Sequence, residues 1–412
     1  MQVAARPDAA LPTPLSDDEF AASMAPFAPF EHRPAVAVAV SGGRDSLCLA
    51  LLASRWAARQ GGDLVALTVD HGLRTDSAAE SRQVGDWLRR HGIRHHILRW
   101  SGPYPTSGIQ AAARQARYRL LADHCVAQGI LHLLVGHHRD DQGETVLIRH
   151  ESSSGRDGLA AMAAVNEQNN LRLLRPLLDM PRERLAATLT ALGQSWIDDP
   201  SNENPAMARG RLRSSDVATS LSEAAVSANN SADARVLAEG ETACLAARAL
   251  RFHPAGFITI DRAVLAAGTP EIIERVLARA VMAVAGRSYP PRSVRTKRLA
   301  QIIAGGEVFS GHTLAGCRLV GHENAIHVCR EAARIGPPVE LMAGTTTVWD
   351  NRFRVSVTKS LGRDAKLAAL TAKGWKQIVR VDPQLRNIPI PYAARTVLPA
   401  LWSGEVVSNV PH

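Results

Sequence analysis

The chain lacks the features of a membrane protein or an exported protein. No apolar stretch reaches the roughly 18 residues that a membrane-spanning helix needs. The N-terminal segment contains Pro, Ala and acidic residues, but neither the basic start nor the apolar centre of a signal peptide. The five cysteines are scattered, with no CxxC pair and no Cys/His cluster at zinc spacing. A disulfide framework is therefore not expected, and a reducing cytoplasm is the predicted location.

Lysine is also scarce. The first lysine is Lys297, so arginine supplies almost all of the positive charge, yet the formal net charge is +9 over 412 residues. A basic protein of this size often binds a polyanion such as nucleic acid, whereas a GC-rich genome would favour arginine without any such role. Charge alone leaves both explanations open. The length exceeds that of one compact domain and predicts two or three.

The first half alternates apolar runs with helical patterns. Strands are predicted at residues 35–40, 64–69, 94–98 and 131–135, and helices at 47–59, 80–91 and 109–128. This alternation indicates the α/β class, with a doubly wound parallel sheet. Ligands of such sheets bind at the carboxyl ends of the strands, and most of the polar residues considered below follow strand ends.

A glycine-containing loop, Ser41-Gly42-Gly43-Arg44-Asp45-Ser46, follows the first predicted strand and opens a helix. Glycines permit a sharp turn close to a ligand, and the unpaired N–H groups and dipole of a helix start attract phosphate. The serines can add hydroxyl donors. Asp45 would repel phosphate unless a cation lay between them, which assigns it to Mg²⁺. The loop is neither a Walker loop, because GKS and GKT are missing, nor a GxGxxG motif.

This loop resembles the SGGxDS signature of the pyrophosphate-loop (PP-loop) superfamily, whose members split ATP between the α and β phosphates. Together with four further segments it resembles, closely and in order, the tRNA(Ile)-lysidine synthase family over roughly residues 35–213. The resemblance implies a Rossmann-like PP-loop sheet, a mainly helical middle region and a smaller α+β C-terminal region. The four segments are Val69-Asp70-His71-Gly72-Leu73-Arg74, residues 108–118 (GIQAAARQARY), residues 136–145 (GHHRDDQGET), and residues 196–202 (WIDDPSN) ahead of Arg209, Arg211 and Arg213.

The resemblance also implies a reaction. Members of this family use ATP and Mg²⁺ to adenylate the C2 oxygen of the wobble cytidine in the CAU anticodon of an isoleucine tRNA. Free L-lysine then displaces AMP through its ε-amine, which gives lysidine and changes codon reading from AUG to AUA. The expected enzyme is thus an ATP-dependent ligase that forms a carbon–nitrogen bond. Membrane association is not expected, and the oligomeric state is left open, a homodimer included.

The motif residues make chemical sense in these implied roles. Asp45, His137 and Asp141 are the predicted catalytic residues; Asp45 and Asp141 would share the metal, and His137 would contact a phosphate or move a proton. Nucleotide binding is assigned to Ser41, Gly42, Gly43, Arg44, Asp45, Ser46, Asp70 and His71. Binding of lysine or tRNA is assigned to Glu144, Arg114, Arg117, Arg209 and Arg213.

Structural explanations compete with several of these roles. Asp141 and Glu144 have the spacing of a capping box at a helix start. Arg114 and Arg117 share a helix face, where solvated arginines are common. Tyr118 and Trp196 can stack on a base, but aromatics at such positions are more often part of the core.

The sequence departs from the family pattern at three places. Ser152-Ser153-Ser154-Gly155 stands where many members have Arg-Gly-Ser-Gly, Gly210 follows Arg209 in place of Asn, and Gln110 replaces Glu. The first two departures bear on the positioning of tRNA or ATP. The three predicted catalytic residues are kept, so an active enzyme is expected.

Three other functions are alternatives. A PP-loop tRNA thiolase would need catalytic or cluster-binding cysteines, which the scattered cysteines do not provide. An ATP-dependent amidating ligase would act on a small acid, and the basic charge argues mildly against it. A non-catalytic tRNA-binding protein would keep the fold, and ATP turnover in the presence of tRNA would exclude it.

The second half carries few chemical motifs, and its role is predicted from its position. Basic stretches such as Arg292–Arg298 suggest that it grips tRNA away from the anticodon. The predicted organisation is a flexible leader at 1–30 with a short helix around Asp17 to Met24, a PP-loop catalytic domain at 31–213, a linker or loosely held helix at 214–232, a helical tRNA-binding region at 233–310, and a small C-terminal region at 311–412 with short strands and a Pro-rich tail.

Overall fold

The chain divides into two compact units, Met1–Arg235 and Val236–His412. The structure, a computed structural model, describes residues 12–410 apart from 74–75, 103, 106, 152–160, 169, 199–217, 288, 308, 310, 323 and 359–364.

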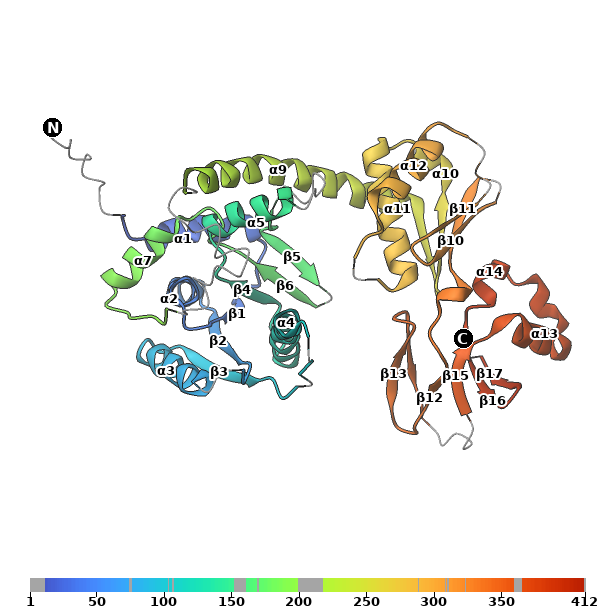
Figure 1. Cartoon of the computed structure of the whole chain (residues 1–412), viewed down its shortest axis with the longest axis horizontal. Helices are drawn as coiled ribbons and strands as arrows, with labels where there is room; N and C mark the ends of the chain where they lie inside the picture. Colours follow the sequence, from blue (N-terminus) through green and yellow to red (C-terminus); the bar gives the residue numbers. More distant parts are fainter. Residues whose placement is uncertain are drawn as a thin grey trace. The chain divides into compact units, whose positions relative to one another are not determined.

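The first unit is built on a six-stranded sheet in the order β3-β2-β1-β4-β6-β5 (Figure 1). The first five strands in this order run parallel, and β5 is antiparallel to β6. The sequence predicted β1 to β4 but missed the last two, because β5 has a single apolar residue and Arg172 interrupts the apolar run of β6. The strands are β1 (Ala35–Ala39), β2 (Asp63–Asp70), β3 (Arg94–Arg99), β4 (His132–Val135), β5 (Val165–Gln168) and β6 (Leu171–Leu174).

Helices cover both faces of this sheet. They are α1 (Asp17–Met24), η1 (Ala25–Phe27), α2 (Arg44–Arg59), α3 (Ser77–Arg90), α4 (Ile109–Ala127), α5 (Arg139–Glu151) and α7 (Arg182–Ala191). Alternate side chains of a strand point to opposite faces, so Val36 and Val38 join a core with α1, α2, α3 and α7 while Ala37 joins a second core with α4. Coverage of both faces leaves the strand ends as the place for a ligand.

The described part of the N-terminal segment is folded onto the first unit. Helix α1 lies where a short helix was expected, and Ser16 and Glu19 form a capping box at its start. Phe20 and Met24 are each 1% exposed and belong to the core that α2 helps to build. Residues 12–30 therefore differ from the predicted flexible leader, because burial of two large apolar side chains fixes them in place.

The boundary between the two units lies within a long helix, α9 (Ala218–Ala249). This helix covers the described part of the predicted linker, where the Ser- and Ala-rich composition also fitted a helix. Among the described helices, this one included, none combines the length and the apolar character of a membrane span.

The second unit contains an antiparallel five-stranded sheet in the order β7-β8-β11-β10-β9. The helices α10, α11 and α12 share one apolar core with this sheet (Figure 1). Strands from both sides of residue 310 pair in it, so the predicted division at that residue separates parts of one sheet. The elements are β7 (Leu250–His253), β8 (Phe257–Asp261), α10 (Arg262–Ala266), α11 (Pro270–Ala285), α12 (Ser293–Ala304), β9 (His312–Leu314), β10 (Cys317–His322) and β11 (Ala325–Arg330).

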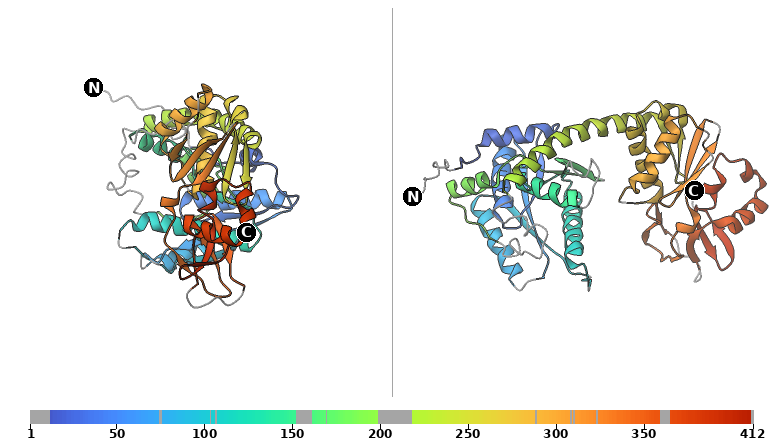
Figure 2. Two further views of the ribbon diagram at one scale, coloured as in Figure 1. Left: turned by 90° about the vertical axis from the view of Figure 1, so that its right-hand side faces the viewer. Right: turned by 45° about the horizontal axis from the view of Figure 1, so that its top comes forward.

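The C-terminal elements of the second unit form a smaller sheet, a hairpin and short helices (Figure 2). Trp375 and Leu398 pack with Phe257 and Cys329 of the larger sheet in one core. The predicted Pro-rich tail is therefore folded. The elements are η4 (Ala332–Arg334), β12 (Val339–Glu340), β13 (Thr346–Trp349), β14 (Phe353–Ser356), β15 (Ala365–Ala369), α13 (Thr371–Val381), η5 (Pro383–Asn387), α14 (Tyr392–Arg395), β16 (Pro399–Ser403) and β17 (Val406–Asn409).

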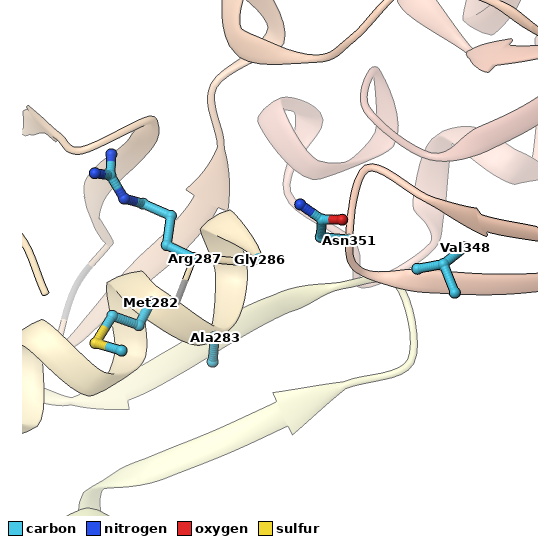
Figure 3. A pocket seen from close by; sticks show the side chains of 6 residues that line it. All are labelled: Met282, Ala283, Gly286, Arg287, Val348 and Asn351. Carbon is cyan, nitrogen blue, oxygen red and sulfur yellow. The ribbon is translucent and has the colours of Figure 1, made fainter. Parts of the chain in front are cut away.

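A cavity of about 530 Å³ lies in the second unit, between the C-terminal end of α11 and the β13–β14 hairpin (Figure 3). None of its described lining residues carries a carboxylate, thiol, hydroxyl or imidazole group. The lining consists of Met282, Ala283, Gly286, Arg287, Val348 and Asn351.

Candidate nucleotide-binding and catalytic site

The loop after β1 turns sharply and packs closely against its neighbours. Gly42 has a φ of +89°, and a Cβ there would lie 2.7 Å from Val84 Cγ2 and 2.9 Å from Ile197 Cδ1. The helix α2 begins at Arg44 with Gly43 as its N-cap, which brings no side-chain acceptor. None of the described side chains caps the first backbone N–H groups of this helix, which are the groups that the sequence assigned to an anion.

The two serines of the loop brace it. Ser46 Oγ donates a hydrogen bond to the Gly43 carbonyl at 2.9 Å and accepts one from the Ser41 N–H at 3.1 Å. The two hydroxyl oxygens lie 3.3 Å apart. The sequence assigned these hydroxyls to phosphate, whereas their hydrogen bonds in the structure maintain the shape of the loop.

The end of β4 lies directly against the loop. β4 pairs in parallel with β1, with Ala39 opposite Val135. A Cβ on the next residue, Gly136, would lie 3.0 Å from the carbonyl carbon and oxygen of Asp45 and from the backbone nitrogen of Ser46. Glycine at this position therefore lets the loop and the residues after β4 form one site.

The structure brings Asp45 and Asp141 together around His138. His138 Nε2 lies 3.5 Å from an oxygen of each carboxylate. Burial opposes ionisation of Asp45, but the hydrogen bond and charge of His138, with Arg44 and Arg182, outweigh it and hold the pKa of this carboxyl below its ordinary value. Burial alone would lower the pKa of His138, but Asp45 and Asp141 raise it.

Asp141 also stabilises the start of α5. Its Oδ2 accepts the backbone N–H of His138 at 3.0 Å, immediately before the first helical residue, Arg139. Asp141 thus caps the N-terminus of α5 from within its first turn. The sequence had suggested a capping box between Asp141 and Glu144, and the structure corrects this. Glu144 lies further along the same helix and is 1% exposed.

His137, which the sequence favoured over His138, has a different partner. Its Nδ1 accepts a hydrogen bond from Arg175 Nε at 3.2 Å. Arg175 follows β6, the strand next to β4, and is 9% exposed. Sequence reasoning missed Arg175 and passed over His138. The adjacent histidines were a signal for His138, whereas only the pairing of β4 with β6 reveals Arg175.

The remaining predicted nucleotide residues lie at the end of β2. Asp70 Oδ1 accepts the Gly72 N–H at 2.9 Å, so this carboxylate braces its own turn. His71 Nε2 accepts hydrogen bonds from Arg117 at 3.2 and 3.1 Å, and burial together with Arg117 lowers the pKa of His71. The guanidinium of Arg114, one turn earlier, lies 5.3 Å from the centre of the Tyr118 ring. Arg114 and Arg117 therefore reach different partners, although both project from α4.

Two further side chains border the loop. Arg182, which the sequence did not single out, is close enough to Asp45 to lower the pKa of that carboxyl. The Arg44 guanidinium lies 6.0 Å from the Trp196 ring, which packs against the core. The predicted residues Arg209 and Arg213, and the departures at 152–155 and at Gly210, lie outside the described residues.

The fold and the loop together define a PP-loop nucleotide-binding protein. The sequence matches the PP-loop domain family over residues 16–219. It is 34% identical to the tRNA(Ile)-lysidine synthase of Ruegeria pomeroyi, over 91% of this chain and 87% of that protein. The chain therefore belongs to the tRNA(Ile)-lysidine synthase family.

Other relatives match in part. The tRNA(Ile)-lysidine synthase of Hyphomonas neptunium is 40% identical over 71% of this chain and 80% of that protein. The enzyme of that name from Bradyrhizobium sp. is 51% identical over 45% of this chain, and this match spans only 53% of the relative's length. Among solved structures, the U34-tRNA thiolase NcsA of Methanococcus maripaludis is similar with a TM-score of 0.45 and 16% identity, over 53% of this chain and 78% of that chain.

Proposed function

We propose that the chain is an active tRNA(Ile)-lysidine synthase. In the first step an oxygen–phosphorus bond forms between O2 of the wobble cytidine and the α-phosphorus of ATP, and pyrophosphate leaves. In the second step the ε-amine of lysine forms a bond to C2 of the base and AMP leaves. The observation that carries the proposal is the convergence of Asp45 and Asp141 on His138 beside an open helix start.

The loop and the two carboxylates serve the first step. The N–H groups at the start of α2 bind the phosphates of ATP. Asp45 and Asp141 would hold Mg²⁺, because their oxygens converge on one nitrogen and this ion takes one or two carboxylates and keeps water elsewhere. In the described residues no cluster of three or more His, Cys, Asp or Glu forms a metal site. When bound, Mg²⁺ would neutralise charge on the phosphate oxygens.

The carboxylates of α5 serve the second step. Asp141 and Glu144 are 8% and 1% exposed, so a lysine ammonium that reached them would lose water and gain a strong ionic partner. The same carboxylates would take up the proton that the ε-amine must lose before it attacks.

Sulfur transfer is the nearest alternative, and four of the five cysteines speak against it, while Cys244 is exposed on α9 and stands alone. Cys48, Cys317 and Cys329 are buried, and burial raises the pKa of each thiol to about 12. Burial also raises the pKa of Cys125, to about 11. A thiol with such a pKa is not a thiolate nucleophile at neutral pH.

The second unit would bind the tRNA away from the anticodon. Arg292, Arg295, Lys297 and Arg298 are exposed at the start of α12. Exposed cations on one short segment suit contact with phosphates of a nucleic acid. Arg114 and Arg117, on α4, would contribute contacts nearer the reacting base, together with Arg209 and Arg213. Charge reversal at Arg295 and Arg298 should raise KM for tRNA and leave KM for ATP unchanged, and an unchanged KM for tRNA would contradict this role.

The test of the whole proposal is incorporation of radiolabelled lysine into an unmodified isoleucine tRNA with a CAU anticodon, with ATP and Mg²⁺ present. Asp45→Asn should lower the rate by about 10²-fold or more, because it removes a charge from the phosphate clamp. Asp86→Asn is the matched control, since Asp86 is 57% exposed on α3 and forms an ion pair with Arg89 on the same helix.

The outcomes separate the alternatives. Full incorporation by Asp45→Asn would contradict the role of the loop. AMP release that needs tRNA, without incorporation, would keep adenylation and contradict lysine as the nucleophile. If the unmodified chain gives neither lysine incorporation nor AMP release, that result would contradict an enzymatic function.

A further inference from the structure

Arg175 is a buried cation whose partners are neutral. Its Nε donates to His137 Nδ1 at 3.2 Å, and its Nη1 donates to the Ala163 carbonyl at 2.6 Å. The Tyr118 side chain, which raises the pKa of this guanidinium, also lies near it. No carboxylate among the described residues forms an ion pair with it. A guanidinium with 9% exposure would normally be paired, so this one leaves positive charge that an incoming anion would balance.

The contact with His137 determines where the imidazole proton lies. An imidazole nitrogen that accepts from a guanidinium, which is always a donor, carries no proton of its own. If Nδ1 is the acceptor, the ring is neutral and its proton is on Nε2. Arg175 therefore holds His137 as an Nε2–H donor. A histidine beside a phosphate site is usually assigned the role of a base, which accepts a proton, so this role is different.

The surroundings strengthen the positive character of this place. The exposed Arg114 lies over the ring of Tyr118, the residue whose side chain lies near Arg175. Burial lowers the pKa of Arg175; the Tyr118 hydroxyl opposes the change, and the charges of Arg114 and Arg235 add to it. These cations are all in the first unit: Arg175 follows β6, Arg114 lies on α4 and Arg235 lies on α9.

We propose that Arg175 is a positioning residue that fixes the Nε2–H tautomer of His137, and that the pair binds an anionic oxygen of a substrate. Arg175 supplies the charge and His137 supplies the donor. The oxygen belongs to a phosphoryl group or to the carboxylate of the amino acid. The nature of this anion rests on the proposed function, whereas the tautomer does not.

The tautomer is measured by long-range ¹H–¹⁵N correlation on the full chain labelled with ¹⁵N-histidine, with the His137 signals identified by their loss in His137→Gln. In the unmodified chain near pH 7.5, Nδ1 should show the shift of an acceptor nitrogen and Nε2 that of a protonated one. A proton on Nδ1, in the Nδ1–H tautomer or in a doubly protonated imidazolium ring, would overturn the proposal. This measurement needs only the unmodified chain and His137→Gln.

Two variants then separate positioning from general loss of charge. Arg175→Met should give mixed tautomers at His137. Arg172→Met is the control, because Arg172 lies on β6, the strand that Arg175 follows, but donates to the carbonyls of Phe27 and Pro29. This variant should leave the His137 signals unchanged. A single unchanged tautomer in Arg175→Met would overturn the positioning role.

The anion is tested by titration of the same signals with inorganic pyrophosphate and with L-lysine, and with cadaverine as a lysine analogue that lacks the carboxylate. A shift of His137 Nε2 with pyrophosphate identifies a phosphoryl oxygen. A shift with L-lysine but not with cadaverine identifies a carboxylate. The effective ligand should bind at least tenfold more weakly to Arg175→Met, and the KM of the corresponding substrate should rise in that variant. No shift with either ligand overturns the anion site. Failure of the unmodified chain to make lysidine would instead contradict the proposed function and leave the tautomer result standing.

Discussion

The two units treat buried charge differently. In the second unit Asp350 lies between Arg330 and Arg352, at 2.9 and 2.7 Å, and the three side chains are at most 10% exposed. The arginines also donate to backbone carbonyls, so each charge has an opposite charge and further hydrogen bonds. In the first unit Arg175 has neutral partners, whereas Asp45 and Asp141 share one imidazole and Asp45 also pairs with Arg44 at 3.3 Å.

The difference teaches that pairing, and not the number of charges, separates a structural network from a site. The Arg330–Asp350–Arg352 network ties β11 to the β13–β14 turn, and its opposite charges are paired with one another. The charges of the first unit follow the ends of parallel strands, where ligands of such sheets bind. Their remaining hydrogen-bonding capacity is what a substrate would use.

The largest expected effect comes from breaking the site and keeping the fold. Asp141→Asn should lower the rate of adenylation by about 10²- to 10³-fold, because one of the two charges facing the phosphates is lost. Its stability should change by only about 1 kcal/mol, since the amide oxygen can still accept the His138 N–H. Single-turnover AMP release and urea unfolding measure the two quantities. If Asp141→Asn instead lowers stability strongly and adenylates normally, Asp141 would be a structural residue, like the buried charges of the second unit.

The second effect comes from breaking the network and keeping the site. Asp350→Asn should lower the free energy of unfolding of the second unit by about 3 kcal/mol, because two buried guanidinium groups lose their counter-charge. Asn is the suitable substitute, since residue 350 has a φ of +49° and Asn tolerates that region. Hydrogen exchange resolved by unit is the measurement. The control is Glu340→Gln, which removes an exposed ion pair with Lys366 and should cost at most about 1 kcal/mol. Equal effects of the two substitutions would show that the network is no stronger than a surface pair.

The smallest effect concerns pH. His95 Nε2 and Thr68 Oγ1 share a hydrogen bond at 2.8 Å. Burial, together with the charges of His96 and Arg89, lowers the pKa of His95 to about 4. The unfolded chain binds the proton near pH 6.5 and the folded chain does not, so stability is full above pH 6.5 and falls as the pH drops toward 4. The loss should reach about 2 kcal/mol. Urea unfolding at pH 7.5 and pH 4.5 measures it, and His95→Gln should reduce the difference between the two. An equal difference in both proteins would assign it to other groups.

The sequence predicted more of the fold than of the site. The apolar runs of β1 to β4 and the six residues from Ser41 to Ser46 signal a strand, a turn and a helix through local chemistry alone. The capping box at Ser16 and the apolar pair Phe20 and Met24 were also present, but their burial depends on α2, which is distant in sequence.

The site residues were harder, because neighbours in space decide their roles. His137 and His138 are adjacent, and only the start of α5 at Arg139 directs one toward Asp45 and the other toward Arg175. Arg175 is 38 residues from His137 in sequence, and the intervening β5 and β6 were not predicted. The hydroxyls of Ser41 and Ser46 have the chemistry of phosphate ligands, yet local hydrogen bonds use them.

The register between β4 and β6 has a consequence for how this chain can change over evolutionary time. His132 lies opposite Arg172 and Leu134 opposite Leu174, so the sheet itself sets the distance between His137 and Arg175. The stretch between α5 and β5 adds one further contact, because the Ala163 carbonyl accepts a hydrogen bond from Arg175. Over evolutionary time, selection for the contact between His137 and Arg175 therefore acts on the register of two strands and on this one carbonyl, and not on the two side chains alone.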